Sequence, residues 1–238
     1  MNSGEKPALT RPELVLEHIA LYGLTLTPIV SRLFCGGNET TTRNLFRTLH
    51  EQRRIVSYSL NRASGLKYHV LSPDEARRRA TAIVSGKLSG KAILTAVSVL
   101  CFCYATPKVH RRRAFLPELE DEMKFPLKSK SASYFVEQGP EYYVGRVIVP
   151  GPKALPTYAI DQISKDAHRL FAFPEARDWF AKRAYRYVVL VESEARRALF
   201  AEAIKLAESG KLPKGVPVDV ACVPDLLKPV TLAKETQS

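Results

Sequence analysis

Hydrophobic residues recur at helical spacing in three short stretches near the start of the chain. Each stretch has its own start and stop residues, which favours separate short helices. We expect threonine or asparagine caps at the three starts and glycine stops at Gly23 and at Gly36–Gly37. The predicted helices run from Thr10 to Tyr22, from Thr27 to Phe34, and from Asn38 to Arg54.

The pattern then changes to alternation with a period of two. Ile55–Leu60 and Leu66–Leu71 alternate on either side of the polar loop Asn61–Gly65, which predicts a β-hairpin. Ser72 is placed to cap a basic helix that continues to about Val84. Three short helices followed by a hairpin is the order of a winged helix-turn-helix domain. We expect that domain at residues 10–84.

The second half of the chain mixes helical and strand patterns. A stretch rich in glycine, serine and lysine at 85–91 predicts a hinge. Strands separated by helices predict an α/β domain with a small mixed sheet at 90–228, so the expected fold class of the whole chain is α+β. Its expected helices are 92–104, 116–123, 156–170, 174–183 and 194–209, and its expected strands are 133–137, 142–149, 185–191 and 216–223.

Composition adds an electrostatic expectation and excludes several classes. The 238 residues carry a formal net charge of +12, which suits a polyanionic partner. No apolar run is long enough for a membrane span, and no signal-peptide pattern is present, so we expect a cytoplasmic protein without membrane contact. The four cysteines lack metal-ligand spacing, and no glycine-rich phosphate loop or HExxH motif occurs. We therefore expect no metal and no cofactor.

The third helix offers the strongest candidate for nucleic-acid contact. Thr42, Leu45, Phe46 and Leu49 recur at core spacing, which turns a polar face outward. Arginine and asparagine are side chains that reach base edges in the major groove, and wing cations contact phosphates. The alternative of a solvated face without a partner applies to any single helix. The candidate DNA-binding residues are Thr40, Thr41, Arg43, Asn44, Arg47 and Arg54 on the helix, and Arg62 and Lys67 on the wing.

Two further basic runs are weaker candidates for the same role. Arg77–Arg79 lies on the helix after the hairpin, where a solvated face or a dimer contact is an equal alternative. Arg111–Arg113 follows the apolar helix and has less support.

Residues 13–71 resemble the winged-helix part of the replication-relaxation proteins of plasmids and integrative elements. The resemblance lies in Leu14–Ile19, Leu45–Leu49 and Ile55–Val56. It implies DNA binding in replication or transcription control, with a C-terminal half similar to restriction-endonuclease-like folds. Active members of such folds carry a strand carboxylate followed by Glu-x-Lys. The strand Tyr143–Pro150 has neither, and Glu137, Glu141 and Asp161 lie elsewhere, so we expect a non-catalytic domain.

The sequence thus predicts a DNA-binding regulator of a mobile element, with a C-terminal domain for dimerisation or for contact with a protein partner. We expect a homodimer on double-stranded DNA. Two alternatives remain: a divergent Mg²⁺-dependent nuclease or nicking protein, and a winged-helix module that binds protein in a larger assembly. RNA binding ranks last because the aromatic sheet motif of RNA-recognition domains is missing.

Overall fold

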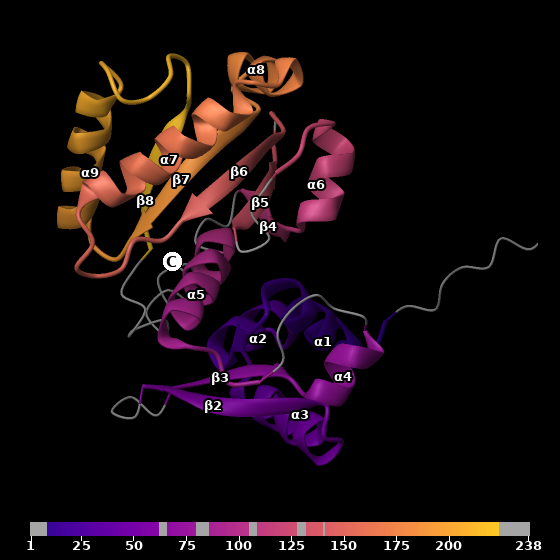
Figure 1. The fold of residues 1–238 in the computed structure, drawn as a ribbon. Helices are drawn as coiled ribbons and strands as arrows, with labels where there is room; N and C mark the ends of the chain where they lie inside the picture. Colours follow the sequence, from indigo (N-terminus) through magenta and orange to yellow (C-terminus); the bar gives the residue numbers. More distant parts are fainter. Residues whose placement is uncertain are drawn as a thin grey trace, which may run out of the picture. The chain divides into compact units, whose positions relative to one another are not determined.

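A computed structural model of the chain describes residues 9–61, 66–79, 86–104, 109–127, 132–139 and 141–223. The chain divides into two compact units, Met1–Ser89 and Gly90–Ser238. The fold is mixed α+β, with an antiparallel sheet in the first unit and a mixed sheet in the second (Figure 1). Within the described ranges, no helix has the length and apolar character needed to cross a bilayer.

The first unit begins with three helices, α1 (Arg11–Tyr22), α2 (Thr27–Phe34) and α3 (Glu39–Glu51). Asn38 caps α3, since its Oδ1 accepts from the backbone N–H of Thr41 at 2.9 Å. Gly23 ends α1 in the left-handed region at φ 81°, as its lack of a side chain allows. These features confirm the predicted helices.

Two predicted caps were wrong. The Thr10 side chain makes no capping hydrogen bond. Thr27 is the first residue of α2 rather than its cap, and its hydroxyl bonds His69 instead.

The end of α3 also differs from the prediction. The helix stops at Glu51, three residues before Arg54, because the chain turns through Arg53 at φ 54°. Arg54 is therefore not part of the helix surface. It begins the connection to the hairpin, where its carbonyl accepts from the backbone N–H of Ser72 at 2.9 Å.

The predicted hairpin is present as β2 (Ile55–Asn61) and β3 (Leu66–Leu71), paired antiparallel. A two-residue strand, β1 (Thr25–Leu26), adds to the other side of β3 and was not predicted, because two residues show no alternation. Ser72 caps the short helix α4 (Pro73–Arg78) by accepting from the N–H of Glu75 at 3.2 Å. The core of this unit includes Val15, Leu16, Ile19, Val30, Leu45, Phe46, Leu49 and Ile55.

The second unit contains a five-stranded sheet of order β4-β5-β6-β7-β8. The first three strands pair antiparallel and the last three parallel, which confirms the mixed sheet. Its strands are β4 (His110–Ala114), β5 (Ser133–Gln138), β6 (Tyr143–Ile148), β7 (Tyr185–Val191) and β8 (Val218–Cys222). Its helices are α5 (Gly90–Tyr104), α6 (Leu116–Met123), α7 (Pro156–Leu170), α8 (Pro174–Ala181) and α9 (Glu194–Ala207).

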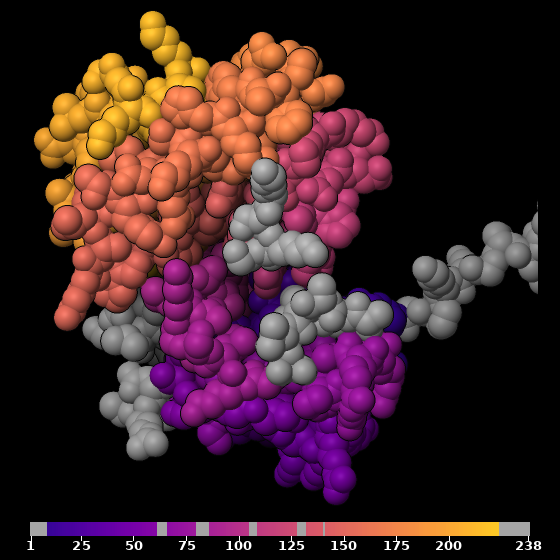
Figure 2. All heavy atoms as spheres, in the orientation of Figure 1, coloured from indigo at the N-terminus to yellow at the C-terminus, as the bar shows by residue number. Residues whose placement is uncertain are grey.

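Alternating side chains build a layer on each face of this sheet. Tyr134 and Val136 of β5 join the main core, to which α6, α7, α8 and α9 also contribute. Phe135 points the other way, where Phe102 of α5 meets its ring edge-on at a centroid distance of 5.0 Å. In the space-filling view, α7, α8 and α9 form much of this unit's visible surface (Figure 2).

Candidate nucleic-acid interface

The outward face of α3 gathers most of the predicted contact residues. Thr40, Arg43, Asn44 and Arg47 are exposed, and Thr41 is half-buried. The opposite face of the helix packs into the core through Thr42, Leu45, Phe46 and Leu49, as the spacing predicts. In the following text, the α3 face means Thr40, Arg43, Asn44 and Arg47.

Two arginines on the α3 face are held by neighbours on the same helix. Arg43 Nη2 donates to Glu39 Oε2 at 3.0 Å, and Arg47 Nη2 donates to Asn44 Oδ1 at 2.9 Å. Arg43 and Glu39 are 75% and 77% exposed, so this pair contributes little stability. Each guanidinium has five N–H donors in a planar fork. These contacts use one nitrogen of each guanidinium, and both side chains are exposed, so other N–H groups can meet a planar acceptor such as a base edge or a phosphate.

Beside the α3 face, a chain of hydrogen bonds ties the helix to the hairpin. His50 Nε2 lies 2.6 Å from Ser57 Oγ, and Ser57 Oγ lies 2.6 Å from His69 Nδ1. His69 Nε2 lies 3.0 Å from Thr27 Oγ1. We call these four residues the His50–Thr27 chain. It joins α3, β2, β3 and α2, so it fixes the angle between the helix and the hairpin.

Burial sets the protonation of the two histidines in this chain. His69 stacks on Phe46 at 3.9 Å, and its burial lowers its pKa to about 3, with smaller contributions from His50 and Lys67. Desolvation and then the charge of Lys67 lower the pKa of His50, against a hydrogen bond to the backbone of Ile55. Both imidazoles are therefore neutral at pH 7. The sequence analysis did not single out these histidines; the available signal was the hairpin register, which pairs Ser57 with His69.

Of the two predicted wing residues, the structure describes only Lys67. Lys67 is exposed on β3, and its charge acts on both histidines of the chain, so it lies near the end of α3. Arg62 lies outside the described residues.

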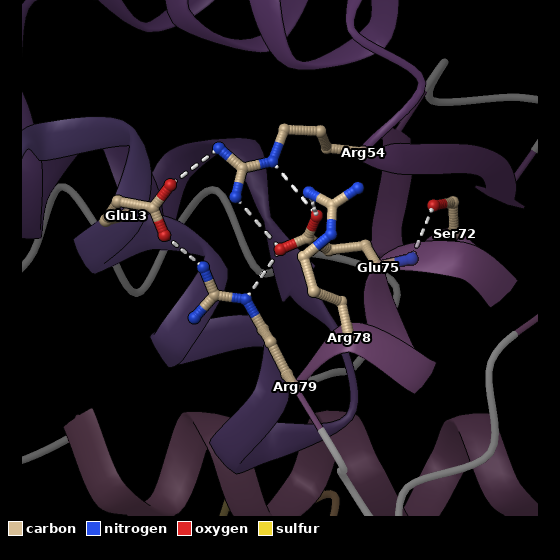
Figure 3. Close-up of polar contacts among 6 residues, drawn as sticks. All are labelled: Glu13, Arg54, Ser72, Glu75, Arg78 and Arg79. Carbon is tan, nitrogen blue, oxygen red and sulfur yellow. Dashed lines mark hydrogen bonds and ion pairs between the residues drawn. The ribbon is translucent and has the colours of Figure 1, made fainter.

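Arg54 lies in a different place from the one predicted. Its Nε and Nη2 donate to Glu75 at 3.0 and 2.9 Å, and its Nη1 donates to Glu13 at 2.6 Å (Figure 3). Its side chain is only 17% exposed. The prediction that Arg54 shares the outward face of the third helix was wrong, because α3 ends at Glu51 and all three guanidinium nitrogens of Arg54 bond Glu13 or Glu75.

Glu75 is the centre of an ion-pair cluster that also contains Glu13, Arg54, Arg78 and Arg79. Figure 3 shows the Glu75 carboxylate between the arginine side chains. Arg79 Nε donates to it at 2.7 Å and Arg78 Nη1 at 3.0 Å, while Arg79 also pairs with Glu13. We call these five residues the Glu75 cluster. Arg77 pairs with Asp74, so all three members of the basic run at 77–79 are ion-paired within the unit.

Three arginines surround the two carboxylates of the Glu75 cluster. Glu75 is 1% exposed, and burial alone would raise its pKa. Hydrogen bonds from Arg54 and Arg79 outweigh that effect and hold the pKa of Glu75 below its ordinary value. The cluster joins α1, the connection after α3, and α4, so it stabilises the frame on which the α3 face is carried.

The second basic run, Arg111–Arg113, lies on β4. Arg111 Nε donates to Glu137 Oε2 at 2.5 Å, and its guanidinium covers the Phe102 ring at 4.3 Å. Arg112 pairs with Glu118. Sequence analysis missed this strand, because three successive arginines hide the alternation. Arg111 and Arg112 are 15% and 41% exposed in these pairs, against 75% for Arg43, so the run is a weaker candidate for phosphate contact than the α3 face.

The carboxylates considered for a nuclease site lie on different elements of the second unit. Glu137 pairs with Arg111, and Asp161 lies exposed on α7. Asp166, which sequence analysis did not single out, is buried between Arg146 and Arg169 and accepts from the Tyr187 hydroxyl at 2.9 Å. Among the residues that the structure describes, no group of three histidine, cysteine, aspartate or glutamate side chains could hold a metal ion.

These observations define a mixed α+β protein of two units whose candidate site is a polar helix face beside a β-hairpin. No protein-family model, curated protein or solved structure matches the chain. The geometry of the site itself therefore carries the functional argument.

Proposed function

We propose that the first unit is a winged helix-turn-helix domain that binds double-stranded DNA, and that the protein regulates transcription or replication of a plasmid or integrative element. The observation that carries the proposal is the α3 face. It presents two guanidinium groups, an amide and a hydroxyl on one exposed helix surface, beside a hairpin that carries Lys67.

The chemistry of the α3 face supports major-groove contact. An α-helix fits the major groove, where arginine pairs with guanine and asparagine with adenine. The hairpin lies beside α3 and is joined to it by the His50–Ser57 contact, so Lys67 is positioned to meet the backbone of the same duplex. The resemblance to replication-relaxation proteins agrees with this arrangement.

The proposal includes a second copy of the chain. Proteins of this kind bind paired half-sites as dimers, and the α/β unit provides the surface for self-association or for a protein partner. Sedimentation of the purified protein alone and with duplex DNA measures both stoichiometries. A monomer that binds a single half-site would remove this part of the proposal.

The test of DNA binding is a fluorescence-anisotropy titration of the full chain. Wild type is compared with Arg43→Ala/Arg47→Ala on duplex from the gene's own upstream region and on a scrambled duplex. We expect each lost base contact to weaken binding to the specific duplex by about 1–3 kcal/mol. The matched control is Arg177→Ala/Arg197→Ala, which removes the same charge from exposed positions of the second unit. An equal loss of affinity for the specific duplex in both double variants would refute the proposal that α3 contacts the bases.

Lys67 has a separate expected effect, because a phosphate contact carries no sequence information. Lys67→Ala should weaken binding to both duplexes alike and reduce the slope of log affinity against log salt by about 1. A change in sequence preference would contradict the phosphate role.

The alternatives give different results in the same experiment. A protein-interaction module would shift neither duplex at any salt concentration. A Mg²⁺-dependent nuclease would nick supercoiled plasmid and stop when EDTA is added.

A further inference from the structure

We propose that His50 is a proton-gated phosphate contact, so that acid pH strengthens DNA binding by adding one positive charge where α3 meets the hairpin. The inference rests on the proposed DNA-binding function and adds a residue and a regulation to it.

The first step is the position of His50. Arg43, Arg47 and His50 follow one another at spacings of four and three residues, which places them along one side of the helix over about two turns. His50 is exposed at the hairpin end of this row, and Lys67 continues the row onto β3. A duplex that contacts both Arg47 and Lys67 therefore passes over the imidazole.

The second step is the hydrogen bonding of Ser57. A serine hydroxyl has one donor hydrogen and two acceptor lone pairs. With neutral His50, the Ser57 hydroxyl donates to Nε2 across the 2.6 Å contact; with protonated His50, Nε2–H donates to the same oxygen. In the His69 tautomer with the proton on Nδ1, the second lone pair of Ser57 Oγ accepts from His69 in both cases, and with protonated His50 the hydroxyl hydrogen turns away from the two rings. The imidazole can therefore gain a proton without any movement of heavy atoms.

The third step is the balance of charge around the imidazole. The groups that face it are Ser57 and the backbone of Ile55 on β2, and His69 and Lys67 on β3; Arg47 and Glu51 are its charged neighbours along α3. Desolvation and Lys67 keep the pKa of His50 below its ordinary value in the free protein. A phosphate adds negative charge at this point and favours the imidazolium. DNA binding then takes up a proton, and mildly acid pH favours the bound state.

The experiment measures DNA affinity between pH 7.5 and pH 5.5 at several salt concentrations, with the full chain and the duplex that it binds best. One added phosphate contact makes the salt slope more negative by about 0.9, which corresponds to roughly eightfold tighter binding at 0.1 M salt. Wild type should show this gain as the pH falls. His50→Gln should lose it, and His50→Lys should already bind at pH 7.5 with the slope of wild type at acid pH.

The control is His168→Gln, since His168 is an exposed histidine of the second unit with a nearby serine hydroxyl, Ser164 Oγ, at 3.3 Å. It should behave as wild type. If wild type binds duplex but His50→Gln shows the same pH dependence, the inference is wrong while the proposed function stands. If wild type binds no duplex at any pH, the proposed function itself fails.

Discussion

The buried histidines of the first unit should make it sensitive to acid. His18 and His69 are 6% and 5% exposed, and burial lowers their pKa values to about 4 and about 3. An unfolded histidine has a pKa near 6.5. Between these values, the unfolded state binds protons that the folded state excludes. The stabilisation is therefore complete above pH 6.5 and is lost as the pH falls toward 4 and 3.

The magnitude follows from proton linkage. At pH 5 each histidine favours the unfolded state by about 2 kcal/mol relative to pH 7, so the pair should lower the free energy of unfolding by about 4 kcal/mol. His69→Gln removes one titrating group and should reduce this loss to about 2 kcal/mol. The substitution keeps a polar side chain next to Ser57 and Thr27.

Hydrogen exchange of α3 amides as a function of pH reports the opening of the first unit. The single tryptophan, Trp179 on α8, provides a control from the second unit, where His110 and His168 are exposed. Its fluorescence transition should change much less between pH 7 and pH 5. If His69→Gln keeps the full acid sensitivity of wild type, the assignment of the loss to the buried imidazole is refuted.

One further substitution in each unit tests the contacts that stabilise it. Glu75→Gln leaves Glu13 as the remaining carboxylate for Arg54 and Arg79, which are both 17% exposed. The free energy of unfolding, measured in urea, should fall by about 3–5 kcal/mol. Asp74→Asn, whose carboxylate is 77% exposed, should cost at most about 1 kcal/mol, and equal costs would contradict the cluster's role. Gly145→Ala places a Cβ against the Phe135 ring and should destabilise the second unit by about 1–3 kcal/mol, measured by Trp179 fluorescence. Gly210→Ala, with open space around it, is its control; a stable Gly145→Ala would mean that the ring moves aside.

Residues close together in the sequence were sufficient to predict most of the helices and strands. Asn38 and Ser72 cap the helices that their positions predict, and α6 and β7 have the predicted bounds. Such elements depend on neighbours a few residues away, which a sequence displays directly.

Contacts between distant residues account for what was missed. β1 exists only because β3 lies beside it, and β4 only because β5 does. Arg54 was placed on the helix face because nothing nearby shows that Glu13 and Glu75 approach it from 41 and 21 residues away. The His50–Thr27 chain has the same origin, since its members meet only when the hairpin closes. The α3 face was predicted because it belongs to a single helix.

The Glu13–Arg79 ion pair joins positions 66 residues apart, one in α1 and one directly after α4. A domain whose first and last helices are joined in this way can be inserted into another protein, because the chain enters and leaves it at neighbouring points. The same ion pair also determines how the unit bears mechanical force. A pulling force applied at the end of α4 is transmitted to α1 through Arg79, Glu13 and Glu75. Arg54 connects the end of α3 to the same residues, so the helix that carries Arg43 and Arg47 keeps its orientation relative to α1 and α4.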